Sequence, residues 1–178
     1  PGMSALRVTV LQPAARIGLK GPDAAALLQQ AGITVPSAAN RMLLSAPPAG
    51  LGAWPVRVLR LGNTEFLLEQ DEGDAVIGAV RTLARTAGLR AHAVLRADCC
   101  LLLEGNELFD RLSRVCAFDF TQLAAQPDMA VMTLLAEISV TFALDGSQLR
   151  LWADPGFATY LTHTLQSLTS APSHGVHA

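Results

Sequence analysis

Two stretches of the chain repeat one pattern: RLGNTEFLLEQDEGDAVIGAV, from residue 60 to 80, and ALDGSQLRLWADPGFATYLTHTL, from residue 143 to 165. Each predicts a strand, a tight turn, a second strand and a helix. The turns fall at Gly62–Asn63 and Asp145–Gly146, and glycine-containing turns between alternating segments are typical of β-hairpins. This repeated unit decides the fold class.

The two halves of the chain superpose with a shift of 83 or 84 residues. The pairs that match are Gly21 with Gly105, Leu61 with Leu144, Asn63 with Gly146, Thr64 with Ser147, Leu68 with Leu151, Asp71 with Asp154 and Gly73 with Gly156. Matches at both the glycine before a helix and the acidic capping position favour an internal duplication. The alternative is chance recurrence of a common strand–turn–strand–helix pattern.

The order of predicted elements gives an α+β fold of two β-β-α-β-β-β-α units, with mostly antiparallel sheets and packed helices. Strands are expected at 7–12, 16–21, 42–44, 56–61, 64–70, 92–96, 99–105, 129–135, 137–144 and 147–153, and helices at 23–31, 72–87, 106–118 and 155–168. We expect a single duplicated domain over 1–170, with halves of 7–88 and 91–169, followed by a flexible tail at 171–178.

Polar residues before three of these helices are candidate N-caps, namely Asp71, Asn106 and Asp154. The last helix is amphipathic, and its predicted buried side chains are Phe157, Leu161, Leu165 and Leu168. The strand at 137–144 alternates, so Ile138, Val140, Phe142 and Leu144 are predicted on one face and Ser139, Thr141 and Ala143 on the other.

Composition restricts the function class. Hydrophobic residues make up 51% of the 178 residues and charged residues only 16%. This is typical either of an alanine- and leucine-rich proteome or of a subunit that hides apolar surface against another chain. Net charge is −2 and Lys20 is the only lysine, so no nucleic-acid footprint is present. No apolar run long enough for a membrane span and no signal peptide are found, so we expect a cytoplasmic protein.

Motifs for catalysis are missing from the sequence. There is no GxGxxG, P-loop, HExxH or GxSxG pattern, and the four histidines have no ligand spacing. Cys99, Cys100 and Cys116 form no CxxC pair and are expected to be buried thiols. The acidic run at 69–74 fits a helix N-terminus better than a metal cluster. Accordingly we predict no catalytic residue, no cofactor-binding residue and no metal site in this chain.

Two other features point to surface contacts. Arg96 and Asp98 are close enough to form a local ion pair. Trp152 alternates with Leu151 on the last strand, so the indole faces away from the core. A tryptophan on that face meets either a loop or another protein.

The stretches RIGLKGPDAAALLQQAGITVP, RLGNTEFLL, VLRADCCLLLEG, RVCAFDF, MTLLAEISVTF and RLWADPGFATYLTHTL together resemble the gamma-subunit family of heterotetrameric sarcosine oxidase. They are also similar to the folate-binding domain of aminomethyltransferases, the glycine-cleavage T-protein family. The resemblance runs from about Arg16 to Leu168 and depends on the order and spacing of all the motifs together. That domain is itself an internal duplication in the family.

The resemblance implies a place in a larger enzyme. In that family the gamma subunit assembles with alpha, beta and delta subunits that oxidatively demethylate sarcosine and pass the one-carbon unit to tetrahydrofolate. FAD, FMN, NAD and tetrahydrofolate are then expected in the other subunits, with no cofactor in this chain. The Asp-rich stretch of aminomethyltransferases is replaced here by Ala136–Glu137, and by Trp54–Pro55 in the first half. This departure fits a non-catalytic chain.

The sequence therefore predicts a non-catalytic accessory gamma-type subunit that packs against the alpha subunit and, through it, beta and delta. Predicted contact residues are Asn40, Arg41, Arg96, Trp152 and Tyr160. The alternatives are the equivalent subunit of an N-methylglutamate dehydrogenase, a stand-alone folate-binding or aminomethyltransferase-like module, and a bare scaffold. The sequence leaves open the substrate of the complex, whether folate contacts this chain, its oligomeric state and the role of the cysteines.

Overall fold

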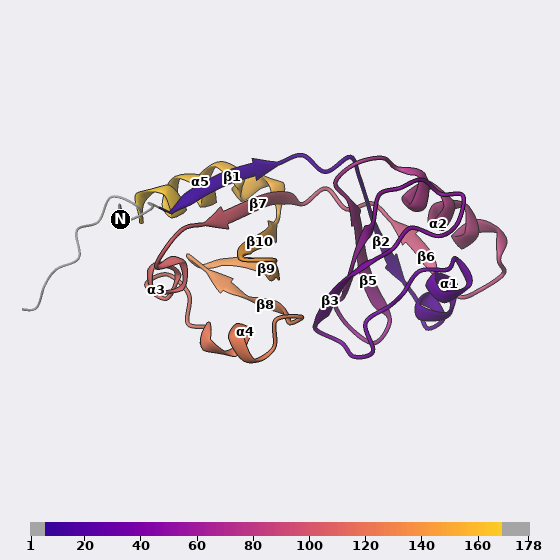
Figure 1. The fold of residues 1–178 in the computed structure, drawn as a ribbon, viewed down its shortest axis with the longest axis horizontal. Coiled ribbons are helices and arrows are strands. Elements are labelled where there is room, and N and C mark those ends of the chain that lie inside the picture. Colours follow the sequence, from indigo (N-terminus) through magenta and orange to yellow (C-terminus); the bar gives the residue numbers. More distant parts are fainter. Residues whose placement is uncertain (1–5, 169–178) are drawn as a thin grey trace, which may run out of the picture.

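The chain folds into two five-stranded antiparallel sheets that pack face to face, with helices on both outer sides (Figure 1). The structure is a computed structural model and describes residues 6–168. The elements are β1 (Arg7–Leu11), β2 (Ala15–Lys20), α1 (Ala24–Gln30), β3 (Arg41–Ser45), β4 (Val56–Arg60), β5 (Glu65–Gln70), α2 (Ala75–Thr86), β6 (His92–Val94), β7 (Cys99–Glu104), α3 (Leu108–Leu112), α4 (Thr121–Ala125), β8 (Ala130–Leu135), β9 (Ile138–Asp145), β10 (Gln148–Ala153), the 3-10 turn η1 (Pro155–Phe157) and α5 (Ala158–Ser167).

Both sheets have the same strand order, and each takes one strand from the other half of the chain. Sheet A runs β1-β7-β10-β9-β8, and sheet B, read from its opposite edge, runs β6-β2-β5-β4-β3. The first strand of each half, β1 or β6, is therefore added to the sheet of the other half. The predicted duplicated α+β fold is confirmed, and the exchange means that neither half of the sequence contains a whole sheet.

Backbone details repeat across the two halves as well. Gly21 and Gly105, matched in the sequence, both have positive φ, at +139° and +142°. Added to Gly21, a Cβ would lie 2.1 Å from the carbonyl oxygen of Arg90, so only glycine fits there. The strand edges of β3 and β8 meet in two equivalent hydrogen bonds, from the Met42 N–H to Asp128 O at 2.7 Å and from the Ala130 N–H to Asn40 O at 2.9 Å.

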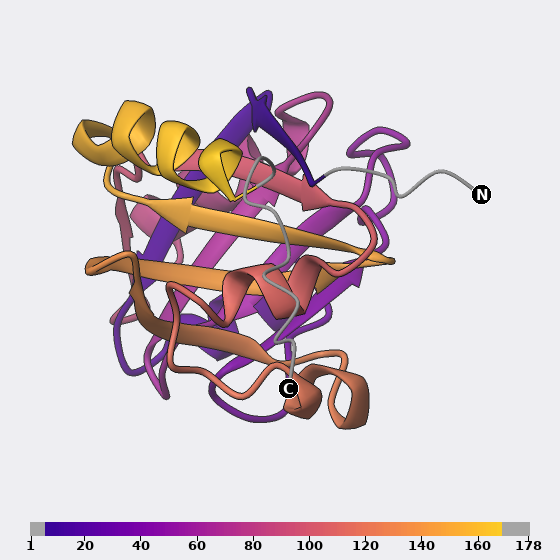
Figure 2. The same ribbon diagram turned by 90° about the vertical axis from the view of Figure 1, so that its left-hand side faces the viewer.

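The interior has three apolar layers. One lies between sheet A and the helices α3, α4 and α5, and another lies between sheet B and the helices α1 and α2. The third lies between the sheets and contains Met42, Leu59, Leu61, Leu67, Cys100, Ala130, Ala143 and Trp152. Figure 2 looks onto the helices of sheet A and shows the strands of sheet B running obliquely behind them. This arrangement explains why β5 and β10 are buried on both faces.

The predicted cap of α2 is wrong. The side-chain hydrogen bonds of Asp71 go to Arg57 and Arg150, and the side-chain oxygen of Gln70 accepts from the N–H groups of Val76 and Ile77, both at 3.2 Å. Asp71 instead pairs with two arginines from the inter-sheet layer. The matching residue, Asp154, does behave as predicted, because its carboxylate accepts from the Gly156 N–H at 2.8 Å.

The second half departs from prediction around its first helix. The expected helix at 106–118 is a single short turn, α3, and a separate helix, α4, follows it. Glu107, with φ of +62°, precedes α3 in place of the predicted Asn106 cap. In the last helix Leu161, Leu165 and Leu168 are buried as expected, but Phe157 is 44% exposed because it lies in η1, before the helical period begins. The predicted tail at 171–178 lies outside the described residues.

A buried carboxylate links the two sheets. Glu69 on β5 is fully buried and accepts from the Arg16 Nε at 2.6 Å and from the Trp152 Nε1 at 3.0 Å. Its other oxygen lies 2.6 Å from Nη2 of Arg150 and 3.6 Å from Nη1 of Arg57. A buried carboxylate is tolerated only when it is paired in this way.

Two further carboxylates complete the network at its outer side. Arg57 donates to Asp145 at 2.7 Å and to Asp71 at 3.2 Å, and Arg150 pairs with the same two acids. Three arginines, including Arg16, thus face three carboxylates, so the buried set is balanced in charge. Asp71 and Asp145 are partly exposed, so only Glu69 depends wholly on the protein for its counter-charges.

We predict that Glu69→Gln destabilises the fold by about 3–5 kcal/mol, because it leaves buried guanidinium groups without their counter-charge. Glu65→Gln is the matched control on the same strand, since Glu65 pairs with Lys20 at 3.0 Å at the surface. That pair is worth about 1 kcal/mol or less. Chemical denaturation of both variants measures the two effects. Equal losses of unfolding free energy would contradict the account.

Candidate functional site

The five predicted contact residues fall in three places. Arg96 and Trp152 line a cleft between the sheets, and Asn40 and Arg41 line a second hollow beside β8. Tyr160 lies apart on α5, half exposed, with its hydroxyl donating to the Ala136 carbonyl at 3.3 Å. Whether any of them contacts another chain stays a prediction.

Trp152 meets neither of the expected partners. Its side chain is 1% exposed and packs in the layer between the sheets, with the indole N–H bonded to Glu69. The sequence correctly placed it opposite Leu151, but that face is covered by the other sheet. The tryptophan is therefore buried within this chain, where it joins the two halves through Glu69.

Asn40 and Arg41 lie at the junction of the two halves. Arg41 donates to Asp128 at 2.8 Å and to Gln126 at 2.6 Å, while Asn40, with φ of +59°, contributes a backbone carbonyl to the β3–β8 junction. The adjoining hollow has a volume of about 460 Å³ and is also lined by Phe118. These residues have a clear structural task within the chain.

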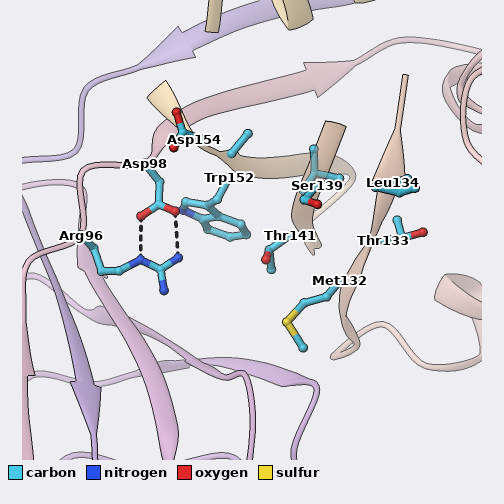
Figure 3. A pocket seen from close by; sticks show the side chains of 11 residues that line it. Arg96, Asp98, Met132, Thr133, Leu134, Ser139, Thr141, Trp152 and Asp154 are labelled. Carbon is cyan, nitrogen blue, oxygen red and sulfur yellow. Dashed lines mark hydrogen bonds and ion pairs between the residues drawn. The ribbon is translucent and has the colours of Figure 1, made fainter. Parts of the chain in front are cut away.

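The larger cleft has a volume of about 580 Å³ and is the best candidate for a functional site (Figure 3). It forms because the inner face of β8 and β9 extends beyond the part that sheet B covers. Met132 and Leu134 on β8 are left 53% and 57% exposed there. Ser139 and Thr141 on β9 add two hydroxyls to the same face.

The opposite wall of the cleft is the connection from β6 to β7, where the predicted ion pair is confirmed. Arg96 donates to both carboxylate oxygens of Asp98, each at 2.8 Å (Figure 3). Burial by itself raises the pKa of Asp98, but the hydrogen bonds and positive charge of Arg96 outweigh it, so this pKa lies below its ordinary value. Both side chains are thus charged at neutral pH, and they are hydrogen-bonded to each other.

The lining of the cleft is suited to binding. A serine or threonine nucleophile needs a neighbouring base, and none of the described lining residues is a histidine or cysteine. The carboxylate of Asp98 is held by Arg96, and that of Asp154 accepts from the Gly156 N–H. What remains is an apolar floor with two hydroxyls at its edge, which fits an apolar group that also carries hydrogen-bonding atoms.

The thiols and acids elsewhere do not form a site in the part of the chain that the structure describes. Cys100 and Cys116 are buried as predicted, whereas Cys99 is only partly buried because it points to the other face of β7 from Cys100. Burial raises the pKa of Cys100 to about 12. Within residues 6–168, no cluster of three or more His, Cys, Asp or Glu side chains could hold a metal ion. In the same range, every helix is too short or too polar to cross a membrane.

Sequence reasoning missed the cleft itself. Alternation along β9 did place Ser139 and Thr141 on one face of the strand. The exposure of Met132 and Leu134 had no signal in the sequence, because MAVMTLL predicts a strand and does not show what covers it. These two side chains lie beyond the Ala130 end of β8, where that strand bonds to the segment leading into β3.

Comparisons with solved structures show the fold. One chain of heterotetrameric sarcosine oxidase from Corynebacterium sp. U-96, in complex with pyrrole 2-carboxylate, superposes with a TM-score of 0.77 at 22% identity, covering 98% of this chain and 90% of that one. Glycine cleavage system aminomethyltransferase T from Bartonella henselae superposes with a TM-score of 0.70 at 15% identity, covering 92% of this chain and 46% of the aminomethyltransferase. The aminomethyltransferase-like fold expected from the sequence is confirmed.

Comparisons based on the sequence found no match. No protein-family model matches the chain, and no curated protein matches it. The likeness therefore lies in the three-dimensional arrangement of the strands and helices.

Acid titration tests the charged wall of the cleft. The folded pKa of Asp98 is lowered, so its pairing stabilises the fold above the ordinary pKa of about 3.9, and this stability is lost as the pH falls through the lower folded value. Arg96→Met is predicted to lower the unfolding free energy by about 1.5–3 kcal/mol at pH 6. The difference from wild type should shrink below about pH 4.

Arg114→Met is the control for this titration, because Arg114 is exposed and its side chain has no hydrogen bond or ion pair with any other described residue. Its difference from wild type should be small at every pH. If the Arg96→Met difference also stayed constant from pH 6 to pH 2, the pairing would not be an ionic one.

Proposed function

We propose that this chain is a non-catalytic accessory subunit, of the gamma type, in an oxidoreductase complex related to sarcosine oxidase. The main support for the proposal is that this chain and the similar sarcosine oxidase chain align over nearly their whole lengths. The two chains cover 98% and 90% of each other, so the similar chain is a subunit of nearly this size within a heterotetrameric enzyme. The match to aminomethyltransferase T covers only 46% of that larger chain.

The interior of the molecule supports this assignment. Its most deeply buried charged groups, Glu69, Arg57 and Arg150, are paired with one another and with Trp152. Catalytic acids and bases normally face a cleft with unusual pKa values, whereas these side chains join one sheet to the other. The buried charged groups therefore serve to hold the two sheets together.

The surface of β8 supports assembly. It is an outermost strand of sheet A, and beyond Ala130, whose N–H bonds to the Asn40 carbonyl, its strand pairing is with β9. Its sequence AVMTLL has no charge and no proline. Natural proteins commonly place charged residues or proline on a free strand edge to prevent pairing with another chain, and β8 lacks both. Met132 and Leu134 stand exposed on this strand beside the cleft. We infer that another subunit covers them in the complex.

The remaining parts of the proposal follow from the same family resemblance. The flavins FAD and FMN, NAD and tetrahydrofolate would be held by the alpha and beta subunits, with delta completing the complex in the cytoplasm. The reaction of the whole would be oxidative demethylation of sarcosine with transfer of the one-carbon unit to tetrahydrofolate. A related N-methyl amino acid, as in N-methylglutamate dehydrogenase, is the alternative substrate.

One observation favours a second candidate, a stand-alone folate-binding or aminomethyltransferase-like module. The cleft volume of about 580 Å³ lies within the range of small-molecule sites. Under this reading the isolated chain would bind tetrahydrofolate beside Met132 and Thr141. Titration calorimetry with tetrahydrofolate separates the two functions, since the accessory subunit is expected to give no binding heat.

Co-expression with the proteins encoded beside this one tests the accessory role. We expect a stable complex, and we expect Met132→Ser with Leu134→Ser to weaken it about tenfold or more. Burying one such side chain is worth about 1.5–3 kcal/mol, and 1.4 kcal/mol is a factor of ten in affinity. Binding of the purified chain to the remaining subunits is measured by biolayer interferometry.

Leu44→Ser is the matched control, because Leu44 is also about half exposed and lies on β3, the strand of sheet B that corresponds to β8. It should leave the affinity unchanged. A chain that stays monomeric in the presence of all the co-expressed proteins would refute the accessory role.

A further inference from the structure

Three of the thirteen basic side chains have no partner among residues 6–168. Arg81, Arg85 and Arg114 make no side-chain hydrogen bond or ion pair with any residue that the structure describes. The other ten are held by carboxylates or carbonyl groups, as Arg90 is by Asp23 and Arg60 by the Pro36 carbonyl. Two of the three unused cations, Arg81 and Arg85, lie together.

Arg81 and Arg85 are one helical turn apart on α2 and border a groove between α2 and β6. Like charges at this spacing repel each other and destabilise a helix slightly. His92 is the third basic lining residue, and the described lining has no carboxylate. The groove therefore has an uncompensated positive rim.

The floor of the groove is apolar. The groove has a volume of about 440 Å³ and is lined by Ile17, Ala84, Ala93, Val94 and Leu95 in addition to the basic residues. Leu95 is 87% exposed, the highest value among the exposed large hydrophobic residues described. Leu95 continues the apolar floor made by Ile17, Ala93 and Val94, and such a contiguous apolar surface with a polar rim is typical of an interaction site.

The fold itself does not require this charge. In the other half, α5 packs on β1 as α2 packs on β6, and the α5 sequence ATYLTHTLQS has no lysine or arginine. The positive rim is thus specific to one half of a duplicated structure. The groove and the cleft share no lining residue, although Leu95 of the groove and Arg96 of the cleft are neighbours in the chain.

We propose that this groove binds an extended segment of a partner protein in which acidic residues alternate with an apolar one. The Cβ atoms of helical residues four apart are about 5–6 Å from each other. Residues i and i+2 of an extended chain are about 6.6 Å apart, so two carboxylates at these positions reach Arg81 and Arg85 together. The side chain between them points the other way, toward Val94 and Leu95.

The chemistry of the groove favours carboxylates of a protein over the other large anions. Nucleic-acid affinity depends on neutralising many phosphates at once, and the basic residues here number three, with one a histidine. Arginine pairs with carboxylates in a two-pronged geometry that suits a single acidic side chain. This proposal depends on the proposed function in one respect: the acidic segment would belong to another subunit of the complex.

Binding to the groove is tested on the isolated chain by titrating it with a capped peptide, Gly-Glu-Leu-Glu-Gly, and measuring the chemical shifts of its backbone amides by NMR. We expect shifts confined to residues 81–85 and 92–95, and at least tenfold weaker binding for the Arg81→Glu, Arg85→Glu double variant. Arg114→Glu, the same charge change elsewhere, should bind as wild type. Equal binding of a Gln-for-Glu peptide, shifts elsewhere, or tighter binding of single-stranded DNA would each overturn the proposal.

The partner is tested in the assembled complex by carbodiimide coupling, which joins amines to carboxylates in direct contact. Lys20 is the only native lysine, so Arg85→Lys places one new reactive amine at the groove and Arg114→Lys places one at a control site. We expect the first variant alone to couple to an acidic segment of another subunit. If the complex forms without this coupling, the groove proposal is wrong and the accessory role still holds. If no complex forms, the accessory role is wrong, and the peptide experiment alone decides whether the groove binds acidic segments.

Discussion

The contact between Glu69 and Trp152 is the constraint on which the rest of the fold depends. Under the shift of 83 residues these two positions correspond, so the bond joins equivalent points of the two halves. Arg16 and Arg150 supply counter-charges to this buried carboxylate, at 2.6 Å each. A buried ion pair adds little net stability but permits few alternative arrangements. Its role here is to fix how one sheet lies against the other.

Duplication with strand exchange explains the shape that results. Because β1 and β6 each complete the sheet of the opposite half, the halves share hydrogen bonds as well as a core. The two sheets then overlap only in part, and the cleft beside Met132 is what the overlap leaves open. The two ends of the molecule also differ, since α2 carries free arginines and α5 carries none. A symmetrical framework therefore presents two unlike surfaces.

Local patterns predicted most of the fold, and their failures have physical causes. Every expected strand exists, because alternation and turn glycines are local signals, and the matched glycines Gly21 and Gly105 share one conformation. Asp71 and Trp152 were misread because each bonds to a residue of the opposite half, Arg150 and Glu69, which no local pattern reports. The cleft had no sequence signal either, since exposure of Met132 depends on where the other sheet ends.

The central claim is that this chain works by holding other chains while its own polar interior serves structure. Native mass spectrometry of the co-expressed neighbouring proteins tests it most directly, because it reports subunits and bound cofactors in one measurement. We expect a complex with one copy of this chain, whose flavin and NAD masses stay with the other subunits when the complex is dissociated in the gas phase. A flavin or folate mass retained on this chain alone would contradict it.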